Sequence, residues 1–426
     1  MSRAGAIKLR CARDMRYKNQ MTSQTESNVR PIGQASPMPV WRLVVPVVIL
    51  AGLGTAAFAL HAQAGQGPRL ALSIVFGAIF GIALQRSRFC FFCMFRDWYD
   101  NRDPRGMLGL ILALAVGMAG YTIVFGAWLP DATTGRLPPD AFIGPVSIVL
   151  VLAGLAFGAG MAISGSCVSA HLYRLGEGSP TAPFALIGTM LGFVLGFLTW
   201  NWLYLGVVST APIIWLPGQL GYAGALVFGL GTLVLIAIAL SRKIQARPAE
   251  TPSRVDLWRA IFVTRWPAWV GGLVIGALGV ASYLRVAPLG VTAEIGGRAR
   301  DAAGYFGWLP ARLEGLDTLR GCVTLVRDAA LSQNGAFVGA LVLASFAAAL
   351  AAGQFAPARP TGGQVVRGLG GGVLLGWGAM TGLGCTVGTL LSGIMAGALS
   401  GWVFGAAVFI GIAVTLTFGR KAGITA

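Results

Sequence analysis

Residues 154–167 read GLAFGAGMAISGSC, and residues 372–385 read GVLLGWGAMTGLGC. Both stretches have the spacing G-x3-G-x-G-x6-C, and the second copy follows the first 218 residues later without a gap. Leu172 and Leu390 extend the match. Glycine spacing alone is weak evidence, because GxxxG is common wherever membrane helices pack closely. A cysteine in the same register adds weight to it, so the chain is expected to contain two related halves.

The sequence around these stretches is that of a membrane protein. Of its 426 residues 55% are hydrophobic and 11% are charged, and the mean hydropathy is +0.72. These values exclude an ordinary soluble helical protein. Long apolar runs predict about eight to ten spans of ~30 Å of hydrocarbon. The runs are Trp41–Leu60, Met107–Leu129, Gly144–Ile163, Phe184–Leu205, Gly221–Leu240, Trp266–Leu284, Gly335–Ala352 and Gly371–Phe418.

Basic residues are concentrated in short segments beside these runs. The net charge of +17 would suggest a nucleic-acid partner in a soluble protein. Here the pattern instead orients a protein in its bilayer, so no nucleic-acid partner is expected. Arginines in the segments 1–40 and 242–265, together with Arg420 and Lys421, predict that both termini and the central linker are cytoplasmic. The charge-poor stretch Gly206–Gly218 is expected to face outward.

The same features divide the chain into four parts. Residues 1–40 are basic and polar and are expected to form a disordered cytoplasmic tail. Residues 41–241 and 266–426 are expected to be the two transmembrane halves, joined by the cytoplasmic linker 242–265. The predicted fold is therefore an all-α integral membrane protein, a polytopic helical bundle with an internal two-fold pseudo-repeat and short re-entrant helix-loop-helix elements.

The re-entrant elements are predicted at the two cysteines, where small residues interrupt the apolar runs. Irregular backbone at membrane depth is tolerated only where it is buried in protein or lines a cavity. A turn that leads into a helix presents free N–H groups, which favour an anion. We therefore predict substrate contacts at Gly165, Cys167, Gly384 and Cys385. The alternative is that the glycines only allow close helix packing.

A third candidate element, residues 85–93, reads QRSRFCFFC. Its arginines, with Arg96 nearby, could attract a dianion toward an entrance, or they could simply anchor a helix end at the interface. Cys90 is its candidate thiol. A neutral thiol is a soft, weak hydrogen-bond donor, suited to a polarisable sulfur atom. Cys11 and Cys322 are expected to be ordinary buried cysteines.

Several common chemistries are not indicated by the sequence. None of the four lysines follows a glycine in a P-loop pattern, which argues against nucleotide hydrolysis. The stretches Gly144–Gly176 and Val365–Gly419 contain no carboxylate, so a buried proton relay is not expected. With only His61 and His171, a histidine-rich metal site is not expected either. We therefore expect a protein that is not an enzyme and carries no cofactor or metal.

The chain from about Leu70 to Phe418 resembles the YeeE/YedE sulfur-transport family of inner-membrane proteins. The resemblance is carried by Arg-Phe-Cys ending at Cys90, Ser-Gly-Ser-Cys ending at Cys167, Gly-Leu-Gly-Cys ending at Cys385, and Pro-Leu-Gly-Val-Thr at 288–292. It implies uptake of thiosulfate or a related small sulfur-containing anion, passed between these three thiols through S–H···S contacts. It also implies a small soluble TusA-like sulfur carrier as cytoplasmic partner.

Two features depart from the family pattern, namely a C-x2-C pair formed by Cys90 with Cys93 and a long segment at Arg285–Asn334. The pair supports a rival function, a membrane thiol-disulfide oxidoreductase that relays electrons through Cys90–Cys93 and Cys167–Cys385. Bulky aromatic neighbours and the absence of a thioredoxin-like sequence context argue against it. A third possibility keeps the scaffold but changes the substrate to another oxyanion or a selenium compound.

Overall fold

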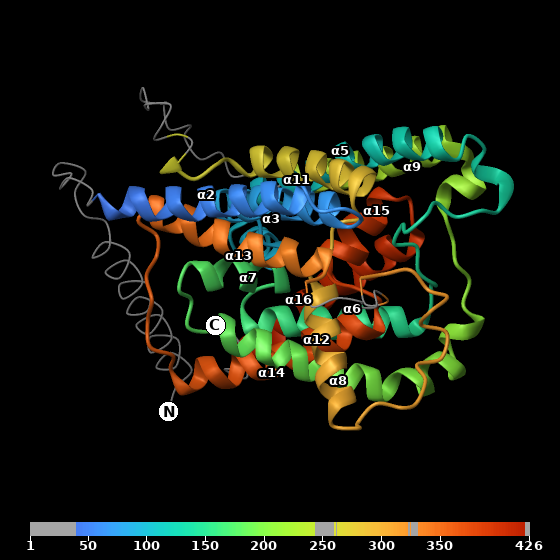
Figure 1. Ribbon diagram of the computed structural model, residues 1–426. Helices are drawn as coiled ribbons and strands as arrows, with labels where there is room; N and C mark the ends of the chain where they lie inside the picture. The colour runs from blue at the N-terminus through green and yellow to red at the C-terminus, as the bar shows by residue number, and fades with distance from the viewer. Residues whose placement is uncertain (1–39, 243–259, 261, 323, 325–330, 422–426) are drawn as a thin grey trace, which may run out of the picture. The chain divides into compact units, whose positions relative to one another are not determined.

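The computed structural model describes residues 40–242, 260, 262–322, 324 and 331–421, and these form helices joined by turns (Figure 1). The predicted tail 1–40, except residue 40, and most of the predicted linker 242–265 lie outside this part. The helices before the linker are α2 (Trp41–His61), α3 (Gly67–Ser87), α4 (Phe91–Asn101), α5 (Arg105–Trp128), α6 (Ile148–Ser164), α7 (Val168–Gly176), α8 (Ala182–Gly206) and α9 (Leu216–Ser241), with short 3-10 turns at Ala132–Thr134 and Val208–Thr210.

The helices after the linker include one irregular stretch, which precedes the last helix of the chain. They are α11 (Ala268–Arg285), α12 (Thr292–Tyr305), α13 (Gln333–Ala351), α14 (Gly362–Thr381), the π-helix η3 (Thr386–Ser392), the short α15 (Gly393–Met395) and α16 (Leu399–Lys421). Local sequence explains several helix starts. Ser147 caps α6, Ser332 caps α13, and Thr361 with Gln364 forms a capping box at α14.

The helix contacts repeat between two sets of helices in the same chain order. Helix α3 packs against α13 as α11 packs against α5, and α8 packs against α14 as α16 packs against α6. Equivalent helices also contact each other, α3 with α11 and α6 with α14. This pattern is that of an internal two-fold arrangement, as predicted.

One further helix precedes each set, α2 before α3 and α9 before α11. We propose that the duplicated unit therefore starts at α2 and at α9, ahead of the boundary predicted at residues 242–265. Each unit then has five long helices, and an odd number of spans would place the two copies in opposite orientations across the bilayer.

Glycines on α6 and α14 allow the closest of these contacts. A Cβ added to Gly160 would meet the carbonyl oxygen of Gly371 at 2.6 Å, and one added to Gly371 would meet that of Gly160 at 2.8 Å. Gly378 approaches the carbonyl of Ala153 in the same way. The repeated glycines thus pack helices tightly, which is the alternative that sequence analysis left open for them.

The exposed surface of the bundle is that of a membrane protein. Within the described residues, nine helices are long and apolar enough to span a bilayer, or ten if α14 and the helix after it, bent by 44°, count as one broken span. Helices α2 and α9 expose large apolar side chains, such as Val48, Phe58, Val227 and Leu235. Lipid is the solvent such faces require. The all-α polytopic fold is therefore confirmed.

Candidate functional site

The first predicted turn, residues 164–167, connects α6 to α7. Helix α6 ends at Gly165, whose φ of 82° is left-handed, and a Cβ there would meet nothing within 4 Å. Cys167 follows in extended conformation and immediately precedes α7. Its side chain is fully buried. Glycine therefore supplies the reversed backbone, and the cysteine lies at the start of a helix.

The second predicted turn, residues 381–385, has the same layout. Helix α14 ends at Thr381, and Cys385, fully buried, immediately precedes the π-helix η3. The left-handed residue here is Leu383, with a φ of 59°, at the repeat position that Gly165 occupies in the first turn. Gly384 is needed for close packing, because a Cβ on it would lie 2.6 Å from Oγ1 of Thr389.

One contact closes both turns at equivalent repeat positions. In the first, Nε2 of His171 and Oγ of Ser164 are 3.1 Å apart. In the second, Oγ1 of Thr389 donates to the carbonyl of Gly382 at 3.1 Å. Each bond joins the helix after the turn to the residue at the end of the helix before it. These two contacts were not predicted, since the residue types differ between the copies.

The first turn meets the third predicted element. Cys90 lies between α3 and α4, is fully buried, and places its Sγ 3.9 Å from Sγ of Cys167. Oγ of Ser169 lies 3.3 Å from the same Cys167 sulfur. Two thiols from separate helix breaks therefore form one contact inside the bundle, whereas the pairing considered from the sequence was that of Cys167 with Cys385.

An arginine that sequence analysis did not single out flanks these thiols. Nη2 of Arg174, on α7, donates to Sγ of Cys93 at 3.2 Å, and its Nη1 lies 3.4 Å from the carbonyl oxygen of Gly165. No carboxylate of the described chain lies within salt-bridge distance of Arg174. Its position seven residues after Cys167 places it two turns along the same helix, which is the signal that could have revealed it.

The three arginines predicted near this element differ in environment. Arg86 is 2% exposed, its Nη2 donates to the carbonyl of Thr264, and its Nε and Nη1 have no hydrogen-bond partner in the part of the chain described. Arg88 is exposed, and Arg96 forms an ion pair with Asp97. A buried guanidinium with free donors leaves positive charge close to the thiol-bearing turn.

Cys385 lies in a different group of residues from Cys90 and Cys167. Its neighbours include Thr292, at the start of α12, and Cys322, from the segment between α12 and α13. The structure therefore sorts the predicted thiols into a Cys90–Cys167 pair and a separate Cys385 group.

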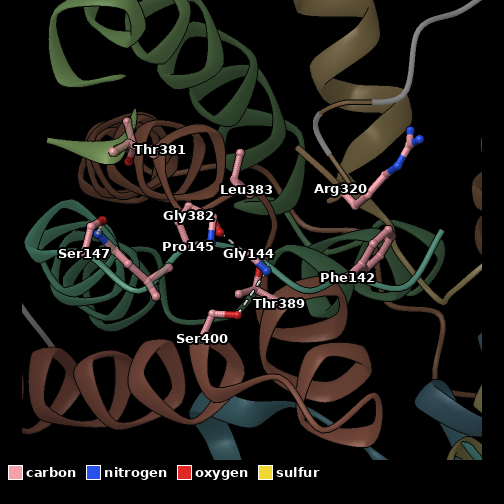
Figure 2. Close-up of a pocket in the computed structure, with 12 residues that line it drawn as sticks. Phe142, Gly144, Pro145, Ser147, Arg320, Thr381, Gly382, Leu383, Thr389 and Ser400 are labelled. Atoms are coloured by element: carbon pink, nitrogen blue, oxygen red, sulfur yellow. Dashed lines mark hydrogen bonds between the residues drawn. The ribbon is translucent and has the colours of Figure 1, made fainter. Parts of the chain in front are cut away.

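A narrow crevice borders the second turn on one side (Figure 2). It has a volume of about 10 Å³, close to the least that a single water needs, and it is lined by Gly382 and Leu383. The N–H of Gly144 donates to Oγ of Ser400 across it at 3.2 Å. In Figure 2 the guanidinium of Arg320 points away from the other lining residues. This side of the second turn is thus closely packed.

Comparisons with known proteins agree on one family. The family model described as Sulphur transport matches residues 86–414. The thiosulfate transporter TsuA of Spirochaeta thermophila is 27% identical over 340 residues, which cover 78% of this chain and 93% of that protein. TsuA of Escherichia coli is 25% identical over 353 residues, covering 77% and 88%. The probable transporter YedE of Salmonella typhimurium is 25% identical over 190 residues, covering 44% and 45%. With helix breaks and buried thiols inside the matched region, this chain belongs to the Sulphur transport (YeeE/YedE) family.

Proposed function

We propose that the protein takes up thiosulfate, or a related small sulfur-containing anion, along a path lined by Cys90, Cys167 and Cys385. The observation that carries the proposal is the contact between the buried thiols of Cys90 and Cys167, each held at a helix break. Neutral thiols in a buried path can donate weak S–H···S bonds to a polarisable sulfur and release it again. The relatives named as thiosulfate transporters support this substrate class.

Positive charge beside the path supports an anionic substrate. Arg174 reaches Cys93 and has no carboxylate partner in the described residues, and Arg86 retains two free donors. A dianion passing Cys90 and Cys167 would find charge complementarity there. The bilayer itself would be the inner membrane, with both termini in the cytoplasm, and a TusA-like carrier is the proposed cytoplasmic acceptor.

The decisive experiment is uptake of labelled thiosulfate into proteoliposomes. Wild-type protein is expected to transport it, and Cys167→Ala and Cys385→Ala are each expected to abolish transport while keeping the thermal unfolding midpoint in detergent. Normal uptake by both variants would refute the thiol path. Absence of uptake by the folded wild type would refute the substrate.

A second candidate function, thiol-disulfide oxidoreduction, is favoured by one specific observation. Cys93 lies next to Cys90 in the C-x2-C motif, and Arg174 donates to its sulfur, an environment that promotes thiolate chemistry. An electron relay through this pair should fail in Cys93→Ala, whereas an anion path based on Cys90 should tolerate that change. Measuring thiosulfate uptake and dithiol oxidation on the same Cys93→Ala preparation separates the two.

A further inference from the structure

Cys322 packs directly against the second cysteine-bearing turn. It is fully buried, and its sulfur fills space left by three glycines. A Cβ on Gly290 or on Gly388 would overlap Sγ of Cys322, and one on Gly384 would lie 3.6 Å from it. Gly384 and Gly388 belong to the second turn and to η3, so Cys322 contacts the backbone that carries Cys385.

Thr292 provides an independent observation at the same place. It is the first residue of α12, is fully buried, and lies beside the sulfur atoms of both Cys322 and Cys385. Its Oγ1 has no hydrogen-bond partner among the described residues. A buried hydroxyl without a partner is uncommon in native proteins and marks a position where a ligand can complete the bonding.

A second cavity, of about 310 Å³, is lined by Cys322. Helices α12 and α13 both begin at its wall, and the positive ends of their dipoles favour an anion. The lining includes one carboxylate, Glu294. Its Oε1 accepts from Arg298 at 2.7 Å and its Oε2 accepts from Ser332 at 2.6 Å, so its charge is largely balanced.

We propose that this cavity admits the transported sulfur-containing anion to the second turn. Cys322, which lines the cavity, is then a fourth thiol of the path, and the Thr292 hydroxyl, behind the cavity wall, is a donor to the anion as it passes from Cys322 toward Cys385. The inference rests on the proposed function and names residues beyond its three thiols. Burial raises the pKa of the Cys322 thiol well above its ordinary value, so the thiol stays protonated near neutral pH and can donate S–H to the terminal sulfur.

The test measures initial rates of labelled thiosulfate uptake into proteoliposomes over a range of concentrations. Cys322→Ala and Thr292→Val are each expected to raise KM about tenfold, the effect of losing one hydrogen bond to an anion, with a maximal rate within about twofold of wild type. Thr292→Ser keeps the hydroxyl and is the matched control, expected to keep the wild-type KM. Cys11→Ala controls for removal of a cysteine elsewhere in the chain.

A second readout does not depend on transport. Thiosulfate, compared with sulfate at equal ionic strength, should raise the unfolding midpoint of the wild type in detergent, and Cys322→Ala should reduce that increase. If Cys322→Ala does not fold, Cys322→Ser of similar volume is measured in its place. A lower midpoint with unchanged KM would show that Cys322 only fills space and would overturn the inference.

The two proposals fail in different ways. If the wild type transports thiosulfate, Cys167→Ala and Cys385→Ala abolish it, and Cys322→Ala with Thr292→Val keep the wild-type KM, then only this inference is wrong. If the folded wild type does not transport, the proposed function fails and this inference fails with it.

Discussion

The two cysteine-bearing turns share a backbone plan but differ in what surrounds it. In each turn, a residue with left-handed backbone conformation follows a long helix, and a second helix begins directly after a cysteine. The first turn contacts a second thiol, that of Cys90, and the guanidinium of Arg174. Beside Cys385 lie Cys322 and two buried hydroxyls, those of Thr292 and Thr386, without hydrogen-bond partners among the described residues. Duplication thus preserved the turn and allowed its lining to diverge, charged at one copy and neutral at the other.

The largest expected difference between the turns comes from Arg174. Replacing it by Gln should reduce thiosulfate uptake roughly 10- to 100-fold, because a charge-assisted hydrogen bond contributes about 1.5–3 kcal/mol. Arg174→Lys keeps the charge but not the fork geometry and should be intermediate. The measurement is uptake at subsaturating thiosulfate.

The matched control for that prediction is Arg320 beside the second turn, whose guanidinium points away from the crevice. Arg320→Gln should stay within about twofold of wild type, since an exposed charge contributes little. Equal losses in the two variants would mean that the charge acts only through the overall field of the protein and that the turns do not differ as described.

A smaller effect is expected from the bonds that close the turns. Thr389→Val removes the donor to the Gly382 carbonyl and should cost about 1–2 kcal/mol of unfolding free energy. His171→Leu should cost less, because Oγ of Ser164 still bonds the carbonyls of Gly160 and Ser166, at 2.8 and 3.2 Å. Unfolding midpoints in detergent measure both. A larger loss in His171→Leu would contradict this order.

The smallest effect concerns the left-handed residues. Gly165→Ala should cost about 1 kcal/mol, because the space beside it is open and only the backbone conformation is penalised. Leu383→Gly relieves a similar backbone cost but removes a buried leucine side chain, whose burial contributes about 1.5–3 kcal/mol. This substitution should therefore also destabilise the protein slightly. A stabilised Leu383→Gly protein, judged by its unfolding midpoint, would show that Leu383 packs poorly.

Much of the fold follows from hydropathy alone. The predicted runs Trp41–Leu60 and Phe184–Leu205 correspond within a few residues to α2 and α8. Helix α3 was not among the runs, because Gln85, Arg86 and Ser87 lower the hydropathy at its end. Helix α12 was missed as well, since its charged side chains do not resemble a span. Both helices are stabilised by contacts with other helices, which hydropathy does not report.

Only those parts of the site that depend on residues close together in the sequence could be predicted. Small residues before a cysteine indicated both turns, but the contact of Cys90 with Cys167 was not predicted, since the sequence suggested Cys90 with Cys93 and Cys167 with Cys385 as the pairs. Arg174 was not singled out, because its contact with Cys93 joins α7 to α4, which is distant in sequence. Cys322 was expected to be an ordinary buried cysteine, because its contact with the second turn depends on segments distant in sequence. Cys322 in particular reaches Cys385 only through the fold of the segment between α12 and α13.

The contact of Gly160 with Gly371 has its repeat counterpart in the contact of Gly378 with Ala153, because the two pairs are related by the offset of 218 residues, and both lie where α6 touches α14. Any added side chain at either position would push the two helices apart, and each helix leads directly into one of the cysteine turns. A substitution at either glycine is therefore expected to displace the turns at Cys167 and Cys385 together.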